Sequence, residues 1–182
     1  MRRGLVKLTC MLAFILIAIC TGKAQPYKQL TTNDFQGPPR HYGDVVAETA
    51  CSISLKYDVH ARNNYYQLTF YVTLEVDREK SWLDRDIRNN PAKLIEILKH
   101  EQGHYSISYM EQQELLRTFD RTRFDENYKD EVNEIFERIH AKYQQLNRDY
   151  DDDTSHSRNL VQQASWDKYF RRKLAYMPPV SS

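Results

Sequence analysis

Polar and apolar residues alternate along two stretches of the chain, residues 52–59 and 67–76. A period of two places one row of side chains toward a core and the other toward water, as in a β-strand. The four residues 61–64, Ala-Arg-Asn-Asn, have the composition of a turn. We therefore predict an antiparallel β-hairpin with one solvated face.

From residue 90 onward, apolar residues recur at helical spacing. Asn90 is a favourable N-cap and Pro91 a favourable first residue, so a first helix is predicted from residue 90 to about residue 118. A second helix is predicted over about residues 125–147, and a third over about residues 159–174. Residues 150–157 between them are rich in turn-forming types and predict a polar connector. The fold class is thus α+β, with a hairpin followed by three helices.

The first 24 residues have a different character from the rest of the chain. A basic start with Arg2, Arg3 and Lys7 precedes an uncharged apolar run, residues 8–19, and Gly22 and Ala24 are small residues before a possible cut. This order is typical of a secretory signal peptide, so we predict cleavage after residue 24 and a secreted or periplasmic protein. The run is shorter than the roughly 20 residues of a membrane span, so no stable span is expected after cleavage. Residues 25–182 then form a single domain.

The net charge argues against a nucleic-acid partner, and the cysteine content argues against an internal disulfide. Residues 1–24 contain four basic and no acidic residues, so their removal changes the formal net charge from +1 to −3. A nucleic-acid partner is not expected, because such proteins carry a strong basic excess. Cys10 and Cys20 lie in the signal, which leaves Cys51 alone. Without an internal disulfide, the fold must be held by its core or by a metal.

The sequence HEQGH at residues 100–104 lies on the predicted first helix. Residues four apart share one helix face, so His100 and His104 can bind one tetrahedral zinc ion from the same side. Glu101 lies about 100° further round, where it can reach a water beside the ion. Together these residues are the minimal motif of a zinc peptidase.

The motif falls on the same helix face as apolar residues such as Ile97 and Leu98, which is the face predicted to pack inward. Buried polar groups without partners cost a few kcal/mol, and a metal would satisfy all three residues of the motif. Gly103 within a helix costs roughly 1 kcal/mol relative to Ala. We therefore expect another element to approach the helix closely at this residue.

A catalytic zinc ion takes three protein ligands and leaves one position open. Two sources of the third ligand are available. One is a glutamate on the second helix: Glu131, Glu134 or Glu137. The other is His156 in the polar connector, where Asp151 or Asp153 could support the ligating imidazole.

Three motifs carry a resemblance to a known family. They are LTTNDFQG at residues 30–37, HEQGHY at residues 100–105, and Y-D-x-x-T-x-H at residues 150–156 followed by Gln162, Gln163 and Trp166. In order and spacing they resemble the bacterial family called domain of unknown function 922, described as predicted secreted zinc-dependent proteases. The resemblance implies a zincin-like domain with HExxH on its first helix and makes His156 the expected third ligand. The chain departs from the family pattern at three positions: Thr32 where Trp is common, Ser106 where an acidic residue is common, and Ser157 where Gly is common.

These features together predict a secreted zinc metallopeptidase. His100, His104 and His156 would hold Zn²⁺, and Glu101 would act as general base toward a water that the zinc activates. Tyr150, or alternatively Tyr105, would donate a hydrogen bond to the developing oxyanion. The hairpin would line the cleft and pair with an extended peptide or protein substrate.

Two other interpretations remain open. In the first, the protein is a non-catalytic secreted module that binds a metal or an envelope partner, with the charged helix at residues 125–147 as its interaction surface. A fourth protein ligand would favour this interpretation, and an open metal position would oppose it. In the second, no metal is bound and the histidines pair with carboxylates in a helical core.

Overall fold

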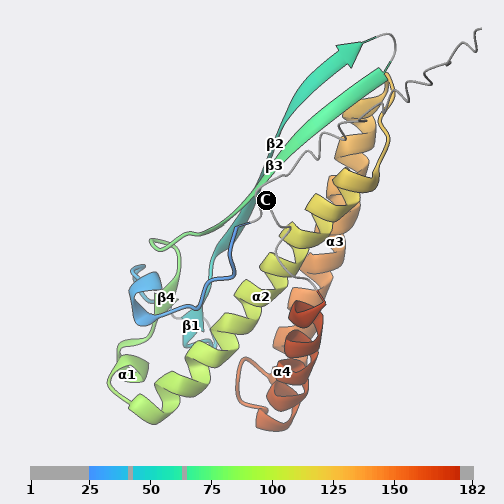
Figure 1. Cartoon of the computed structure of the whole chain (residues 1–182). Coiled ribbons are helices and arrows are strands. Elements are labelled where there is room, and N and C mark those ends of the chain that lie inside the picture. The colour runs from blue at the N-terminus through green and yellow to red at the C-terminus, as the bar shows by residue number, and fades with distance from the viewer. Residues whose placement is uncertain (1–24, 41–42, 63–64, 177–182) are drawn as a thin grey trace, which may run out of the picture.

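The computed structural model describes residues 25–40, 43–62 and 65–176. Within them the chain forms an α+β structure in which a small antiparallel sheet is followed by helices (Figure 1). The elements in order are η1 Thr32–Asp34, β1 Ala47–Glu48, β2 Cys51–Arg62, β3 Tyr65–Val76, β4 Trp82–Leu83, α1 Arg85–Arg88, α2 Pro91–Arg121, α3 Tyr128–Thr154 and α4 Leu160–Ala175. The predicted order of hairpin then helices is confirmed, and η1, the antiparallel pair of β1 with β4 and the single-turn α1 are additional elements.

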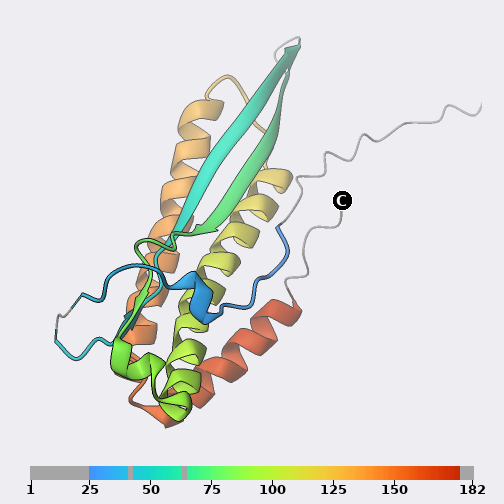
Figure 2. The same ribbon diagram turned by 90° about the vertical axis from the view of Figure 1, so that its left-hand side faces the viewer.

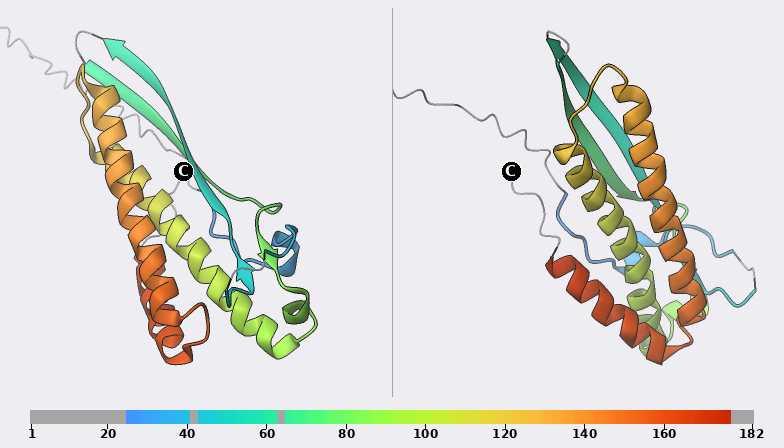
Figure 3. Two further views of the ribbon diagram at one scale, coloured as in Figure 1. Left: turned by 180° about the vertical axis from the view of Figure 1, so that it is seen from behind. Right: turned by 90° about the vertical axis from the view of Figure 1, so that its right-hand side faces the viewer.

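Strands β2 and β3 form the predicted hairpin. They pair antiparallel in continuous register from Cys51 opposite Val76 to Arg62 opposite Tyr65. Along β2, half-buried residues alternate with exposed ones, because every second side chain faces the helices. The hairpin extends beside the C-terminal half of α2 and the start of α3 (Figures 1 and 3). Residues 63–64 of the predicted turn lie outside the described residues.

Helix α2 begins as predicted and is longer than predicted. The side chain of Asn90 accepts a hydrogen bond from the backbone N–H of Lys93 at 3.2 Å, and Pro91 is the first helical residue. The helix then runs for 31 residues and ends at Arg121. Two other long helices, α3 and α4, and the hairpin all pack against it (Figures 1 and 3). This central position explains why many of its polar residues are buried.

The predicted connector at residues 150–157 is wrong over residues 150–154, because α3 continues through Thr154. Tyr150 and Thr154 are four residues apart and both fully buried, and the Thr154 hydroxyl donates to the Tyr150 carbonyl at 2.6 Å. Tertiary packing of this face outweighs the turn preference of the Asp-rich sequence. The chain leaves the helix through three consecutive left-handed residues, Ser155, His156 and Ser157, with φ of 48°, 51° and 76°. Helix α4 follows at Leu160, with Asn159 as its N-cap.

Two apolar clusters form the core along α2. The cluster around the C-terminal half of α2 unites the hairpin with α3 and α4, and includes Phe70, Val72, Leu115, Phe119, Val132 and Ile139. The cluster around the N-terminal half includes Leu30, Phe35, Ala47, Leu74, Leu83, Ile97 and Tyr105. In this second cluster the two-stranded pair of β1 and β4 and the segment of η1 lie against α2 (Figure 2). The motif histidines lie within this half of the helix.

The N-terminal motif at residues 30–37 has a structural role. Phe35 and Leu30 are buried, and the Leu30 backbone N–H donates to the side-chain oxygen of Gln102 at 2.7 Å. A Cβ on Gly37 would collide with the backbone carbonyl of Glu79, so this position requires glycine. The segment therefore holds the loop after β3 on one side and α2 on the other.

Across the described residues, no helix is long and apolar enough to cross a membrane. The predicted signal peptide, residues 1–24, lies outside the described residues.

Candidate metal centre

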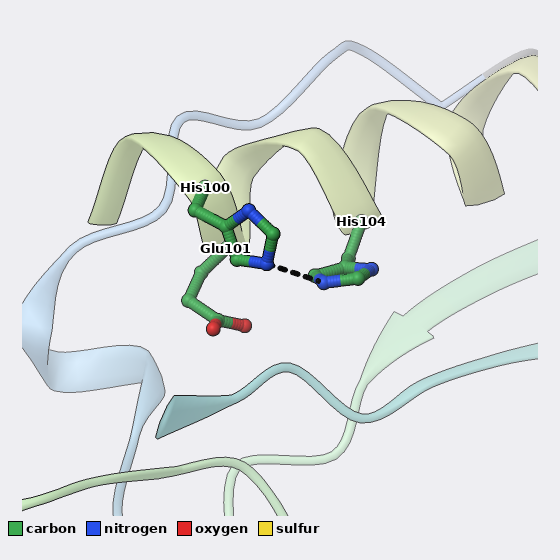
Figure 4. A group of neighbouring side chains, drawn as sticks. All are labelled: His100, Glu101 and His104. Atoms are coloured by element: carbon green, nitrogen blue, oxygen red, sulfur yellow. Dashed lines mark hydrogen bonds between the residues drawn. The ribbon is translucent and has the colours of Figure 1, made fainter. Parts of the chain in front are cut away.

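His100, Glu101 and His104 lie together on one face of α2 (Figure 4). The Nε2 atoms of the two imidazoles are 3.2 Å apart, and a carboxylate oxygen of Glu101 lies within 4.8 Å of both ligand atoms. His100 and Glu101 are 3% and 2% exposed, and the His104 side chain is 12% exposed. The helical spacing thus produces a group of side chains that could hold a metal ion, as the sequence predicted.

Each imidazole is oriented by an amide oxygen on its far side. His100 Nδ1 is 3.2 Å from Gln163 Oε1, and His104 Nδ1 is 2.8 Å from Asn147 Oδ1. An amide oxygen can only accept, so each Nδ1 carries the hydrogen and donates it. In the neutral ring Nε2 then carries the lone pair that a metal ligand requires, whereas in the protonated ring Nε2 also carries a hydrogen and can donate it to a carboxylate.

A carboxylate faces the same space. Asp151 Oδ1 is 3.2 Å from His100 Nε2 and 3.2 Å from His104 Nε2. Burial by itself would raise the pKa of Asp151, but hydrogen bonds from His100 and His104 outweigh it and hold the pKa well below its usual range. Burial would likewise lower the pKa of His104, yet the hydrogen bond to Asp151 and the nearby charge of Glu101 raise it to about 9. Both shifts have one physical cause: the carboxylates beside these rings favour positive charge in the space between them.

The cleft in front of these residues has a volume of about 300 Å³. Its opposite wall is the segment at residues 45–49, which includes β1. From this wall the Thr49 hydroxyl donates to Glu101 Oε2 at 2.6 Å and fixes the glutamate beside the histidines. The expectation that the β2–β3 hairpin lines the cleft is therefore wrong: the short strand β1 does so.

Tyr150 is positioned differently from the prediction. Its ring is fully buried and stacks on the His100 ring with centroids 4.7 Å apart. Its hydroxyl donates to the backbone carbonyl of His100 at 3.0 Å and accepts from Gln163 at 2.9 Å. Because Tyr150 does not line the cleft, this geometry does not support a role as oxyanion donor. Tyr105 does not line it either, since its hydroxyl accepts from the backbone N–H of Lys28 at 3.2 Å.

The same ring explains the glycine of the motif. A Cβ on Gly103 would lie 2.6 Å from Tyr150 Cε1 and still closer to Cζ and the hydroxyl oxygen. Gly103 is thus a point of close approach between α3 and α2, as its presence within a helix suggested. The approaching element is the buried aromatic ring of Tyr150.

The two predicted sources of a third ligand lie in different places relative to the cleft. Glu131, Glu134 and Glu137 lie in the first half of α3, and none of them lines the cleft. His156 does line it, and its Nδ1 is 3.3 Å from Asp151 Oδ1. The His156 side chain is 43% exposed, so it stands at the edge of the group rather than within it.

Three residues of the site were not assigned a place in it from the sequence: Thr49, Asn147 and Gln163. Asp151 was predicted only as a support for the His156 imidazole, and it also lies directly beside the His100 and His104 rings. Asn147 and Asp151 are four residues apart, so a helix extended through Thr154 would have placed both on the face toward α2. Gln163 belongs to the third motif quoted above. For Thr49 the sequence carries no local signal, because its contact with Glu101 spans 52 residues.

Fold and site together define a small α+β protein with a candidate metal centre on its longest described helix. The chain belongs to the bacterial protein family of unknown function DUF922, whose model matches residues 24–157. The match includes the motif histidines, Glu101, Asp151 and His156. Comparison with curated proteins and with solved structures gave no significant match.

Proposed function

We propose that this protein is an exported zinc-dependent peptidase of zincin type, with its metal centre on α2. The observation that carries the proposal is the convergence of two imidazole Nε2 atoms and the Glu101 carboxylate in one cleft. Histidine ligands four apart on a helix with an acidic residue beside them are the donor set of zinc peptidases. The ion would be held by His100, His104 and a third group, either Asp151 at the end of α3 or His156 just beyond it.

The chemistry required of the chain is proton transfer. A bound zinc ion supplies a Lewis acid that polarises a substrate carbonyl and makes water a stronger acid. The Glu101 carboxylate takes a proton from the attacking water and passes it to the leaving amine. Because Thr49 occupies Oε2, the other carboxylate oxygen remains to accept that proton. Burial of both Glu101 and His100 excludes competing solvent and strengthens these interactions.

Substrate would be bound along the wall formed by residues 45–49. Strand β1 pairs with β4 along one edge, and its backbone segment borders the cleft. An extended peptide can add to such a segment through main-chain hydrogen bonds. This supports a peptide or protein as substrate, and export is supported by the signal-like composition of residues 1–24.

Metal content and cleavage test the proposal together. The chain from Gln25 onward is purified without chelator, and its zinc is counted by mass spectrometry before and after EDTA treatment. Cleavage of a fluorescence-quenched peptide library is then compared for the unchanged chain, Glu101→Gln and Glu96→Gln. Glu96 is an exposed residue of the same helix, so its variant controls for the change of charge.

We expect one zinc ion per chain, cleavage that EDTA abolishes, and loss of cleavage in Glu101→Gln with zinc retained. Glu96→Gln should cleave like the unchanged chain. A chain that binds no zinc after resupply, or a Glu101→Gln variant that still cleaves, contradicts the proposal.

One observation favours a non-catalytic alternative. His100, His104 and His156 each place a ring nitrogen 3.2–3.3 Å from Asp151 Oδ1, so four potential ligand residues lie together. If all four bound the ion, the coordination would be closed, as in a structural zinc site. One zinc per chain without cleavage of any library peptide would support this second function, a metal-stabilised interaction module.

A further inference from the structure

Three ligand atoms of the candidate centre form a triangle. The separations His100 Nε2 to His104 Nε2, His100 Nε2 to Asp151 Oδ1 and His104 Nε2 to Asp151 Oδ1 are all 3.2 Å. In a tetrahedral zinc site with bonds of about 2.0–2.1 Å, neighbouring ligand atoms are about 3.3–3.4 Å apart. The triangle therefore already has the dimensions of one face of a zinc coordination tetrahedron.

The position of Asp151 is determined by rigid elements rather than by a loop. It lies within α3, one residue after Tyr150, whose fully buried ring rests against Gly103. Four residues earlier on the same face, Asn147 holds the other side of the His104 ring. Asn147 and Asp151 thus lie on one face of α3. Asn147 orients the His104 ring, and Asp151 reaches the space between both imidazoles. By contrast, His156 lies beyond the end of the helix in left-handed backbone and is 43% exposed.

We propose that Asp151 is the third protein ligand of the metal, and that His156 positions its carboxylate instead of binding the ion. This assignment rests on the proposed function, and it replaces the His-His-His set that the family resemblance implied. His156 Nδ1 lies 3.3 Å from Asp151 Oδ1, so the imidazole can restrain the ligand from the cleft side. A set of two imidazoles and one carboxylate would leave one position of a zinc ion free for water or substrate, and the cleft bordered by residues 45–49 would give access to it.

Zinc affinity distinguishes the two assignments. It is measured by competition with a chromophoric chelator for the unchanged chain, Asp151→Asn, His156→Ala and the control Asp152→Asn, an exposed neighbour on the same helix. Asp151→Asn should weaken zinc binding by more than about 100-fold, because loss of a mere supporting residue already costs 10–100-fold. His156→Ala should weaken it by about tenfold, and Asp152→Asn should leave it unchanged.

The reverse order of the two variants would overturn the assignment. Equal and large losses in both would also overturn it, since they indicate a four-ligand site. An unchanged chain without zinc would instead refute the proposed function, so the two failures are distinguishable. Circular dichroism of each metal-free variant checks that it is folded.

A second measurement needs no variant. X-ray absorption at the zinc edge of the loaded, unchanged chain counts the imidazoles bound to the ion. Two imidazoles support Asp151 as the third ligand, and three overturn it.

Discussion

Replacing Gly103 with alanine tests the contact that positions the site. In an exposed helix this change is favourable, because Ala is the better helix former by about 1 kcal/mol. Here the new Cβ would lie 2.6 Å from Tyr150 Cε1, where ordinary contact needs 3.4–4 Å. The ring would have to retreat by about 1 Å. We therefore expect Gly103→Ala to destabilise the protein despite its helix propensity.

The size of this destabilisation follows from the cost of disturbing the Tyr150 ring and the opposing gain in helix propensity. Overpacking a buried site costs about 1–3 kcal/mol, and a lost buried hydrogen bond adds about 1 kcal/mol. Tyr150 is fully buried and makes such bonds to the His100 carbonyl and to Gln163, so its ring has little freedom to move. After the helix-propensity gain, the net loss is about 1–3 kcal/mol. The melting temperature should fall by about 2–4 °C per kcal/mol in a domain of this size.

Urea denaturation of the metal-free chain measures this loss. The control is a double-mutant cycle with Tyr150→Leu, which removes the atoms that the new Cβ would meet. In that background Gly103→Ala should be neutral or stabilising. If Gly103→Ala instead stabilises by about 1 kcal/mol in both backgrounds, the close approach of α3 at this residue is refuted.

Two further changes test the backbone and charge of other parts of the fold. Ser157 has a φ of 76°, which costs a non-glycine residue roughly 1 kcal/mol, so Ser157→Gly should raise the melting temperature by about 2–4 °C; a fall would contradict this. Burial by itself would raise the pKa of Asp34, but hydrogen bonds from Lys28 and Thr31 outweigh it and lower the pKa below 3.8. Because a lowered folded-state pKa contributes stability above the unfolded value and loses it as pH falls, Asp34→Asn should destabilise most at pH 7 and progressively less below about pH 4. Urea denaturation at pH 7 and pH 3 measures the free energy of unfolding of the unchanged chain and of Asp34→Asn. An equal destabilisation at the two pH values would refute the ion pairing.

The sequence predicted elements whose signals are local. Asn90 and Pro91 mark the start of α2 because capping depends on the first turn alone. The hairpin followed from alternation within residues 52–59 and 67–76, which lie inside the two strands. The spacing of His100 and His104 likewise required only helix geometry to bring both rings together.

What the sequence missed depends on contacts between distant residues. The turn preference of the segment after Tyr150 is overridden because that ring and Thr154 are buried against α2. Strand β1 has two residues, which is too short for any period to appear. Its place beside Glu101 is set by its pairing with β4, and no local pattern reports that pairing.

The connection between α2 and α3 has a consequence for folding order. It lies beside the hairpin, where Phe119 and Val132 of the two helices share one apolar cluster over a short stretch of chain (Figure 1). His100 and Asp151 meet at the other end of the helical pair, away from the connection. They are 51 residues apart in sequence. Contacts that close short loops form at lower entropic cost than contacts that close long ones. Pairing of the helices should therefore proceed from the connection outward, so that the histidines and the carboxylate meet late in folding and separate early in local unfolding.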